Sequence, residues 1–355
     1  MKNTKQKLAI ALLATALLPA LAWADPAKVI RIGVAQVGTG SCPVVGGSAL
    51  SNAHIRGLIE NEFKKDGIKV EWNFFKGAGP AVNEAFANKL LDFASQGDMP
   101  AIVGKAGGLK TRLILATSRY GTIYFGVPSD SPASKLEDLK GKKVALFKGT
   151  NTQLLVNKIL DQKGLTERDF KLINMDTATT QAAIATKDVD GAWFGSDVFQ
   201  LVDRGLVKII YTNKNQPAVL TRQGHILVTE EFEKANPALT QRLVNVVVKT
   251  AAEISEPKNR DKTLQEWAKS GTSYAAYKRD LDGSDLKVRS SPLLDDFFVA
   301  QYRDAIQDSL KFKFIRKGFE VNDWFEPKYQ QQAIKELKLE GYWTELDSKG
   351  NPKNR

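Results

Sequence analysis

The chain has 355 residues, of which 43% are hydrophobic and 26% are charged, and 51 Lys and Arg residues exceed 40 Asp and Glu residues. This composition is typical of a globular protein and excludes a disordered or fibrous chain. The single cysteine, Cys42, excludes an intramolecular disulfide and a cysteine-rich zinc site, and two histidines leave little material for a histidine-based metal centre. At about 150 residues per domain, the length predicts two domains.

The first 24 residues have the pattern of a secretory signal peptide. Lys2, Lys5 and Lys7 form a basic start, which the apolar stretch Leu8–Leu18 follows. Small residues at positions 22 and 24 suit a signal peptidase, so we expect cleavage after Ala24. The apolar stretch would span only about 16 Å, half of a bilayer, which argues against a membrane anchor. We therefore expect the mature protein outside the cytoplasm.

The mature chain then alternates between short apolar strands and glycine-rich turns that open helices. The first strands are expected at Val29–Val34, Lys69–Phe75, Leu91–Ser95 and Arg112–Ala116. The turns follow at residues 38–48, 77–80 and 97–100, and Ser48 is a good N-cap for the next helix. This alternation predicts an open α/β sheet with helices on both faces.

The same pattern restarts in a second, smaller unit. Its strands are expected at Lys143–Phe147, Phe170–Met175, Gly191–Phe194 and Val207–Tyr211, and its glycine turn at residues 148–152. Two extended segments, Thr122–Val127 and His225–Val228, are expected to cross between the units as a hinge. We therefore predict a signal peptide at residues 1–24, one lobe from residues 25–122 plus 228–355, and a second lobe from residues 123–227.

Four glycine turns that precede helices indicate a binding site. In an open α/β sheet, ligands bind beyond the carboxyl ends of the strands, where such turns gather. The free N–H groups and the positive dipole end of each helix attract an anion. A glycine turn can also merely connect a strand to a helix, but four of them in two lobes favour a cleft that closes on a small oxyanion.

The turns supply most of the candidate ligand-binding residues. These are Gln36, Gly40, Ser41, Ser48, Gly79, Pro80, Gly97, Asp98, Met99, Gly149, Thr150, Asn151 and Thr152. Trp193 and Phe194 are either core residues or an apolar wall for the organic part of the ligand. Asp197 would repel a second negative group or bind a polar tail. Arg222 is either a solvated charge at the hinge or a bidentate partner of the oxyanion.

Other chemistries have weaker support in the sequence. Cys42 lies in a loop before a helix and His54 could act as its base, which leaves a thiol-dependent enzyme as the alternative. The simpler interpretation is that Cys42 is a small filler and His54 an ordinary helix residue. No phosphate-binding G-x-x-x-x-G-K-[ST] motif is present, and lysines such as Lys140 are interleaved with acids. Neither nucleotide nor nucleic-acid binding is therefore expected.

The order of the motifs resembles the periplasmic solute-binding proteins of ABC importers for sulfonates, sulfate esters, taurine and nitrate. The residues that carry the resemblance are Ile32-Gly33-Val34 with Gln36, Gly77-Ala78-Gly79-Pro80, Gly97-Asp98-Met99-Pro100-Ala101-Ile102, the segment from Leu136 to Ala145, Lys148-Gly149-Thr150, and Asp188-Val189-Asp190-Gly191-Ala192-Trp193. They extend over most of the mature chain. The resemblance is closest to the sulfate-ester and aliphatic-sulfonate members.

The resemblance implies a two-lobed α/β fold of the type II periplasmic binding proteins, with doubly wound sheets and a two-strand hinge. It also implies a periplasmic, monomeric protein without enzymatic activity or a cofactor. Such a protein captures an organosulfur oxyanion, a sulfate ester or a sulfonate, between its lobes and delivers it to a membrane ABC permease. The same fold family includes a desulfinase with a nucleophilic cysteine in the first loop. Cys42 and His54 resemble that arrangement.

Overall fold

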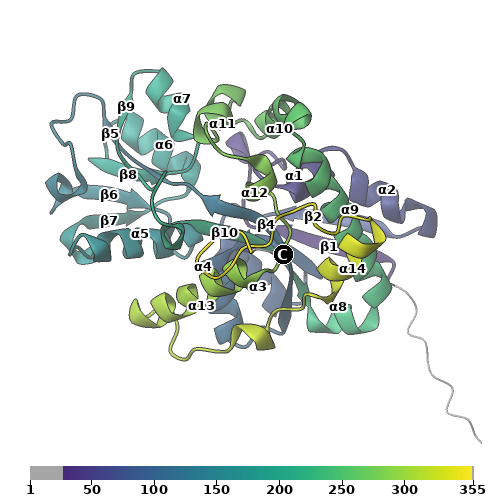
Figure 1. The fold of residues 1–355 in the computed structure, drawn as a ribbon. Coiled ribbons are helices and arrows are strands. Elements are labelled where there is room, and N and C mark those ends of the chain that lie inside the picture. Colours follow the sequence, from purple (N-terminus) through teal and green to yellow (C-terminus); the bar gives the residue numbers. More distant parts are fainter. Residues whose placement is uncertain (1–26, 354–355) are drawn as a thin grey trace, which may run out of the picture.

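Two five-stranded sheets organise residues 27–353, the part of the chain that the computed structural model describes (Figure 1). The predicted signal peptide lies outside the described residues. The first sheet has the order β2 (Lys69–Phe74), β1 (Val29–Val34), β3 (Phe93–Gly97), β10 (Arg222–Thr229) and β4 (Thr111–Gly121). The second has the order β7 (Lys171–Asn174), β6 (Lys143–Leu146), β8 (Gly191–Phe194), β5 (Tyr124–Pro128) and β9 (Val207–Thr212).

Both sheets are mixed and are built in the same way. In the first sheet β1 runs parallel to β2 and β3, whereas β10 runs antiparallel to β3 and β4. In the second sheet β6 runs parallel to β7 and β8, whereas β5 runs antiparallel to β8 and β9. The predicted two-lobed α/β fold is confirmed. The central strands are apolar because helices cover both faces of each sheet, which removes the need for polar side chains there.

Most of the helices belong to the first lobe (Figure 1). These are α1 (Ala49–Ile55), α2 (Leu58–Phe63), α3 (Ala78–Ala87), α4 (Asp98–Ala106), α8 (Glu230–Ala235), α9 (Pro237–Ser255), α10 (Arg260–Trp267), α11 (Tyr274–Asp280), α12 (Leu286–Arg289), α13 (Asp296–Lys311) and α14 (Lys328–Glu336). The second lobe holds α5 (Asn151–Gln162), α6 (Thr177–Ala185) and α7 (Val198–Asp203). Within residues 27–353, no helix combines the length and the apolar character needed to cross a membrane.

The chain passes between the lobes through two connections, residues 122–123 and residues 213–221. The segments that the sequence predicted as crossing strands, Thr122–Val127 and His225–Val228, lie mainly inside β5 and β10. The difference arises because hydrogen bonding to neighbouring strands continues almost up to each connection. Residues 222–227, assigned to the second lobe from the sequence, pair with β3 and β4 of the first sheet.

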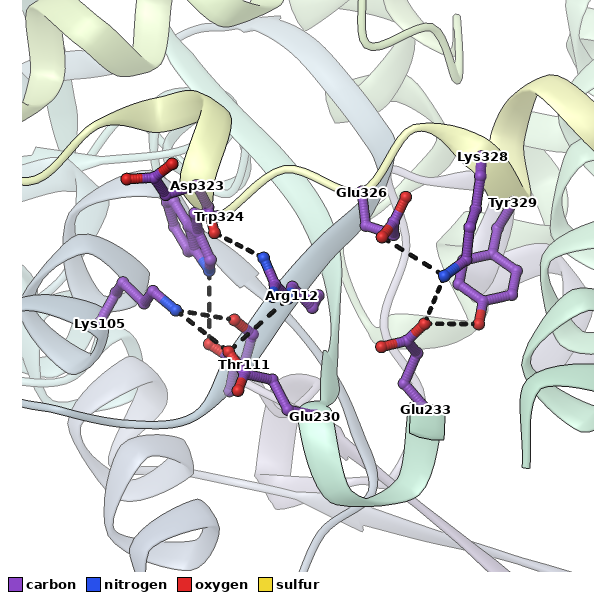
Figure 2. A network of polar contacts seen from close by, with 10 residues as sticks. All are labelled: Lys105, Thr111, Arg112, Glu230, Glu233, Asp323, Trp324, Glu326, Lys328 and Tyr329. Carbon is purple, nitrogen blue, oxygen red and sulfur yellow. Dashed lines mark hydrogen bonds and ion pairs between the residues drawn. The ribbon is translucent and has the colours of Figure 1, made fainter. Parts of the chain in front are cut away.

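A polar network attaches the C-terminal segment to the first sheet (Figure 2). Arg112 on β4 donates a hydrogen bond of 2.6 Å to the carbonyl of Asp323, which lies just before α14. On α14, Lys328 forms a 2.7 Å ion pair with Glu233 of α8, and the Tyr329 hydroxyl donates to the same carboxylate at 2.8 Å. The network holds α14 against α8 and β4, on the part of the first lobe that is remote from the second lobe (Figure 1).

Candidate functional site

A cavity of about 410 Å³ lies between the two lobes. The first lobe lines it with residues at the ends of β1, β2, β3 and β4 and at the start of β10. The second lobe lines it with residues that follow β6, β7 and β8. Apart from the start of the antiparallel strand β10, these are carboxyl ends of strands, which is where open α/β sheets bind their ligands.

The structure brings most of the candidate residues together in this cavity. The predicted residues that line it are Gln36, Ser41, Ser48, Gly97, Thr150, Asn151, Thr152, Trp193, Phe194, Asp197 and Arg222. The predicted residues that do not line it are Gly40, Gly79, Pro80, Asp98, Met99 and Gly149. Most of this second group has a packing role instead.

Gly79 and Gly149 are glycines for structural reasons. A Cβ atom at Gly79 would lie 2.2 Å from the ring of Pro100, so this glycine allows α3 to approach α4 closely. Gly149 has a φ of +76°, which favours glycine, and a Cβ there would lie 2.7 Å from Pro80 in the other lobe. Pro80 and Gly149 therefore form part of the contact between the lobes rather than part of the cavity wall.

Asp98 and Met99 lie in the interior of the first lobe. Met99 packs in the apolar core and is 3% exposed. The Asp98 carboxylate accepts hydrogen bonds from the backbone N–H groups of Met99 at 2.7 Å and Gln223 at 3.0 Å. Burial raises the pKa of Asp98 to about 6, against the effect of these two N–H groups. Asp98 thus fixes the start of α4 to β10 and does not contact the cavity.

The N-terminus of α5 has free hydrogen-bonding capacity at the cavity wall. The N-cap residue, Thr150, makes no side-chain cap, and its hydroxyl donates to the carbonyl of Phe147 at 2.8 Å. The first N–H groups of a helix have no partner inside the helix. By contrast, the N-termini of α4 and α6 already have the carboxylates of Asp98 and Asp176 as hydrogen-bond acceptors.

Arg222 lies beside this helix end and has no carboxylate partner. One guanidinium nitrogen donates to the hydroxyl oxygen of Thr152 at 3.0 Å, and another donates to the carbonyl of Thr122 at 2.5 Å. Its Nε is buried without a hydrogen-bond partner, and among the described residues no carboxylate lies within ion-pair distance. Burial lowers the pKa of Arg222, with Asp280 acting in the opposite direction. A cation held in this way attracts an anionic ligand.

Four further charged residues line the cavity that the sequence did not reveal: Lys76 and Asp176, which pair with each other, and Asp280 and Arg289. The Asp280 carboxylate accepts a hydrogen bond of 2.8 Å from the hydroxyl of Tyr124, and it also accepts one from Thr122. Arg289 donates to the carbonyl of Tyr120 at 2.8 Å, and burial lowers its pKa. Asp280 and Arg289 come from α11 and α12, which lie far along the chain from any glycine turn, so no local pattern marked them.

The Asp197 carboxylate lines the second-lobe side of the cavity. It accepts hydrogen bonds from the Gly195 N–H at 3.0 Å and from the Gln181 amide at 2.7 Å. Burial raises the pKa of Asp197, although these hydrogen bonds oppose the rise. Both carboxylate oxygens thus accept from neutral donors, and Arg222 favours the charged form through space.

Trp193 and Phe194 are mainly core residues. Trp193 is 7% exposed and packs in one apolar cluster of the second lobe, whereas Phe194 is 4% exposed and packs in another. They lie in separate clusters because consecutive side chains of a strand point to opposite faces. The cavity instead has a group of partly exposed aromatic side chains that the sequence did not single out, which includes Trp72 and Phe74.

The Cys42 thiol does not line the cavity. It lies 3.7 Å from the carbonyl of Val44 and 4.0 Å from that of Lys269, and neither carbonyl is a base. His54 lines the cavity, but its ring packs against aromatic residues, and burial lowers its pKa. Among residues 27–353, no group of three or more His, Cys, Asp or Glu residues is placed to hold a metal ion.

Comparison with known proteins identifies related sequences over most of the chain. The family profile described as NMT1/THI5-like matches residues 61–260, more than half of the chain. A Bacillus subtilis (strain 168) protein, named as an aliphatic sulfonates-binding protein, is 28% identical over 323 residues. That alignment covers 87% of this chain and 89% of the relative.

Solved structures share the fold. The crystal structure of the periplasmic sulfonate-binding protein SsuA from Methylobacillus flagellatus KT has a TM-score of 0.76 and 32% identity, and the match covers 91% of this chain and 99% of that chain. The desulfurization enzyme DSZB has a TM-score of 0.65 and 17% identity, with 87% of this chain and 99% of that chain covered. At that identity, the second likeness shows the fold alone.

Proposed function

The chain belongs to the NMT1/THI5-like family, and on that premise we propose that it is the solute-binding component of an ABC importer. It works in the periplasm as a monomer, captures a sulfonate or a sulfate ester between its lobes, and delivers it unchanged to a membrane permease. The printed names of its relatives, which refer to sulfonate binding and to an ABC transporter, support this assignment.

The observation that carries the proposal is the position of Arg222 at the end of α5. The guanidinium contacts Thr152 and faces a cavity in which no carboxylate neutralises it by direct contact. A sulfonate or sulfate ester carries one negative charge over several oxygens. It can accept hydrogen bonds from the guanidinium, the Thr152 hydroxyl and the free N–H groups of α5 together. These donors are already in place, so binding requires little reorganisation.

The test is calorimetric titration of the wild-type protein with sulfonates and sulfate esters, followed by recovery of the ligand. We expect saturable binding and unchanged ligand. Arg222→Gln removes charge-assisted hydrogen bonds worth about 1.5–3 kcal/mol, which predicts an affinity about 10- to 100-fold lower. The matched control is Arg204→Gln, because Arg204 is exposed and lies outside the cavity.

Two results would contradict the proposal. If Arg222→Gln binds these anions as tightly as Arg204→Gln, the oxyanion does not bind at α5. If the wild-type protein converts a sulfur compound and Cys42→Ser abolishes the conversion, the protein is a thiol-dependent enzyme rather than a binding protein.

A further inference from the structure

Aromatic side chains gather at the end of the cavity that is formed by β2, the edge strand of the first sheet. Trp72 and Phe74 lie two residues apart on β2, so both point to the same face of the sheet. His54 of α1 lies over them, with ring centroids 4.5 Å from Trp72 and 5.1 Å from Phe74. Phe147, which follows β6 in the second lobe, lines the same cavity.

These rings differ from the other aromatic residues of the cavity in their exposure. His54, Trp72, Phe74 and Phe147 are only partly buried, whereas Trp193 and the remaining aromatic residues along the wall are at most 8% exposed. Exposed aromatic surface inside a cavity gains free energy when an apolar group covers it. The exposed aromatic surface at this end of the cavity is therefore suited to bind the organic part of a ligand.

Most polar groups at the aromatic end already have a partner, an exception being the buried Nδ1 atom of His54. The Trp72 indole N–H already donates to Glu60 at 2.8 Å. Burial lowers the pKa of His54 below its usual value, which favours the neutral ring and lets it act as an aromatic surface. Lys76, two residues beyond Phe74, forms a 3.4 Å ion pair with Asp176 of the second lobe. This pair joins the lobes at the aromatic end and neutralises the two charges there.

The aromatic end is separated from the base of Arg222 by most of the width of the sheet. β2 and β10 are three strand spacings apart, or about 14 Å at about 4.8 Å per spacing. The Arg222 side chain shortens this gap by extending to Thr152 at the end of α5. The cavity volume of about 410 Å³ lies within the range of about 300–1,000 Å³ that holds drug-sized ligands. A small sulfonate alone would leave most of it unfilled.

We propose that the bound oxyanion carries an aromatic group, and that the ring binds between Trp72, Phe74 and His54 of the first lobe and Phe147 of the second. This inference rests on the proposed function and specifies its ligand. It separates this chain from the relative whose name refers to aliphatic sulfonates. Ring pairs in edge or offset geometry favour an aromatic guest over a saturated one of the same size.

The test compares ligands that differ only in the ring. Benzenesulfonate is paired with cyclohexanesulfonate, and phenyl sulfate with cyclohexyl sulfate, in calorimetric titrations of the wild-type protein. We expect the aromatic member of at least one pair to bind about two- to tenfold more tightly. Phe74→Leu and Phe147→Leu should each reduce this preference, since leucine keeps the apolar volume but not the ring.

The matched control is Phe75→Leu, because Phe75 follows Phe74 directly but packs in a different part of the core and does not line the cavity. This variant should retain the wild-type preference. Equal or tighter binding of both cyclohexyl ligands by the wild-type protein would overturn the inference and leave the proposed function intact. An unchanged preference in both cavity variants would also overturn it. If none of the four anions binds but an open-chain alkanesulfonate does, the inference fails and the proposed function stands. If no sulfonate or sulfate ester binds, both fail.

Discussion

Replacement of Thr152 by valine tests the hydrogen-bond pattern at the end of α5. Arginine has no acceptor, so in the 3.0 Å contact between Arg222 and Thr152 the threonine oxygen must accept. The Thr152 hydroxyl proton is therefore free to donate into the cavity. Thr152→Val removes this donor to a charged ligand, which costs about 1.5–3 kcal/mol and predicts about 10- to 100-fold weaker oxyanion binding. Isothermal titration calorimetry measures the change.

Thr150 provides the matched control for this experiment. Its hydroxyl proton is already donated to the carbonyl of Phe147, so it has none left for the ligand. Thr150→Val should lower the free energy of unfolding by about 1 kcal/mol and leave the affinity nearly unchanged. Thr152→Ser keeps the hydroxyl and should restore most of the binding. Equal losses of affinity in Thr150→Val and Thr152→Val would refute the reasoning.

Two further predictions concern stability. Gly79→Ala places a Cβ atom 2.2 Å from the rigid ring of Pro100, so we expect a loss of about 1–3 kcal/mol in urea denaturation, and an unchanged midpoint would contradict this packing. Burial acts to raise the pKa of Glu233, but Lys328 and Tyr329 outweigh it and lower the pKa. Stability gained from a lowered carboxylate pKa is present above the unfolded pKa, about 4.3, and is lost as the pH falls through the folded pKa. Glu233→Gln should therefore cost about 1 kcal/mol at pH 7 and progressively less below about pH 4, whereas a pH-independent difference would exclude the ion pair as its cause.

The bounds of several strands could be predicted closely because a strand's apolar pattern lies in consecutive residues. Val29–Val34 and Gly191–Phe194 are strands with the predicted bounds, since each is a short apolar run limited by polar or glycine residues. The connections between the lobes were harder to place. β10 was shortened and assigned to a hinge, because its first residues, from Arg222 to Gly224, carry no apolar pattern and are fixed by pairing with distant strands.

The candidate site shows the same division between local and distant causes. The turn before α5 could be identified because Gly149 and the hydroxyl residues Thr150 and Thr152 lie close together in the sequence and precede a helical pattern. Asp280 and Arg289 could not, since the folding of the C-terminal helices brings them to the cavity. A glycine in such a turn can also be required for more than one reason. At Gly79 a glycine is required because Pro100 lies too close for a Cβ atom, and this contact is known only from the three-dimensional structure.

The charges of the cavity suggest why such a site would close around an anion. On the proposed function, bringing the lobes together would remove Arg222 from water, and the desolvation of an ion costs several kcal/mol when no partner contacts it. Asp280, Asp98 and Asp197 favour the charged guanidinium only through space, without an ion pair. Among the ion pairs that join the lobes, the 2.9 Å pair of Lys158 with Asp308 is largely buried, with side chains 11% and 25% exposed, whereas the exposed pairs are weak by comparison. In the 2.5 Å pair of Arg279 with Asp203 the side chains are 44% and 49% exposed, and exposed pairs contribute about 0–1 kcal/mol each. Such surface contacts alone do not offset the buried guanidinium. On the proposed function, the oxyanion supplies a negative charge in direct contact with the guanidinium, so the ligand itself would make the closed arrangement favourable.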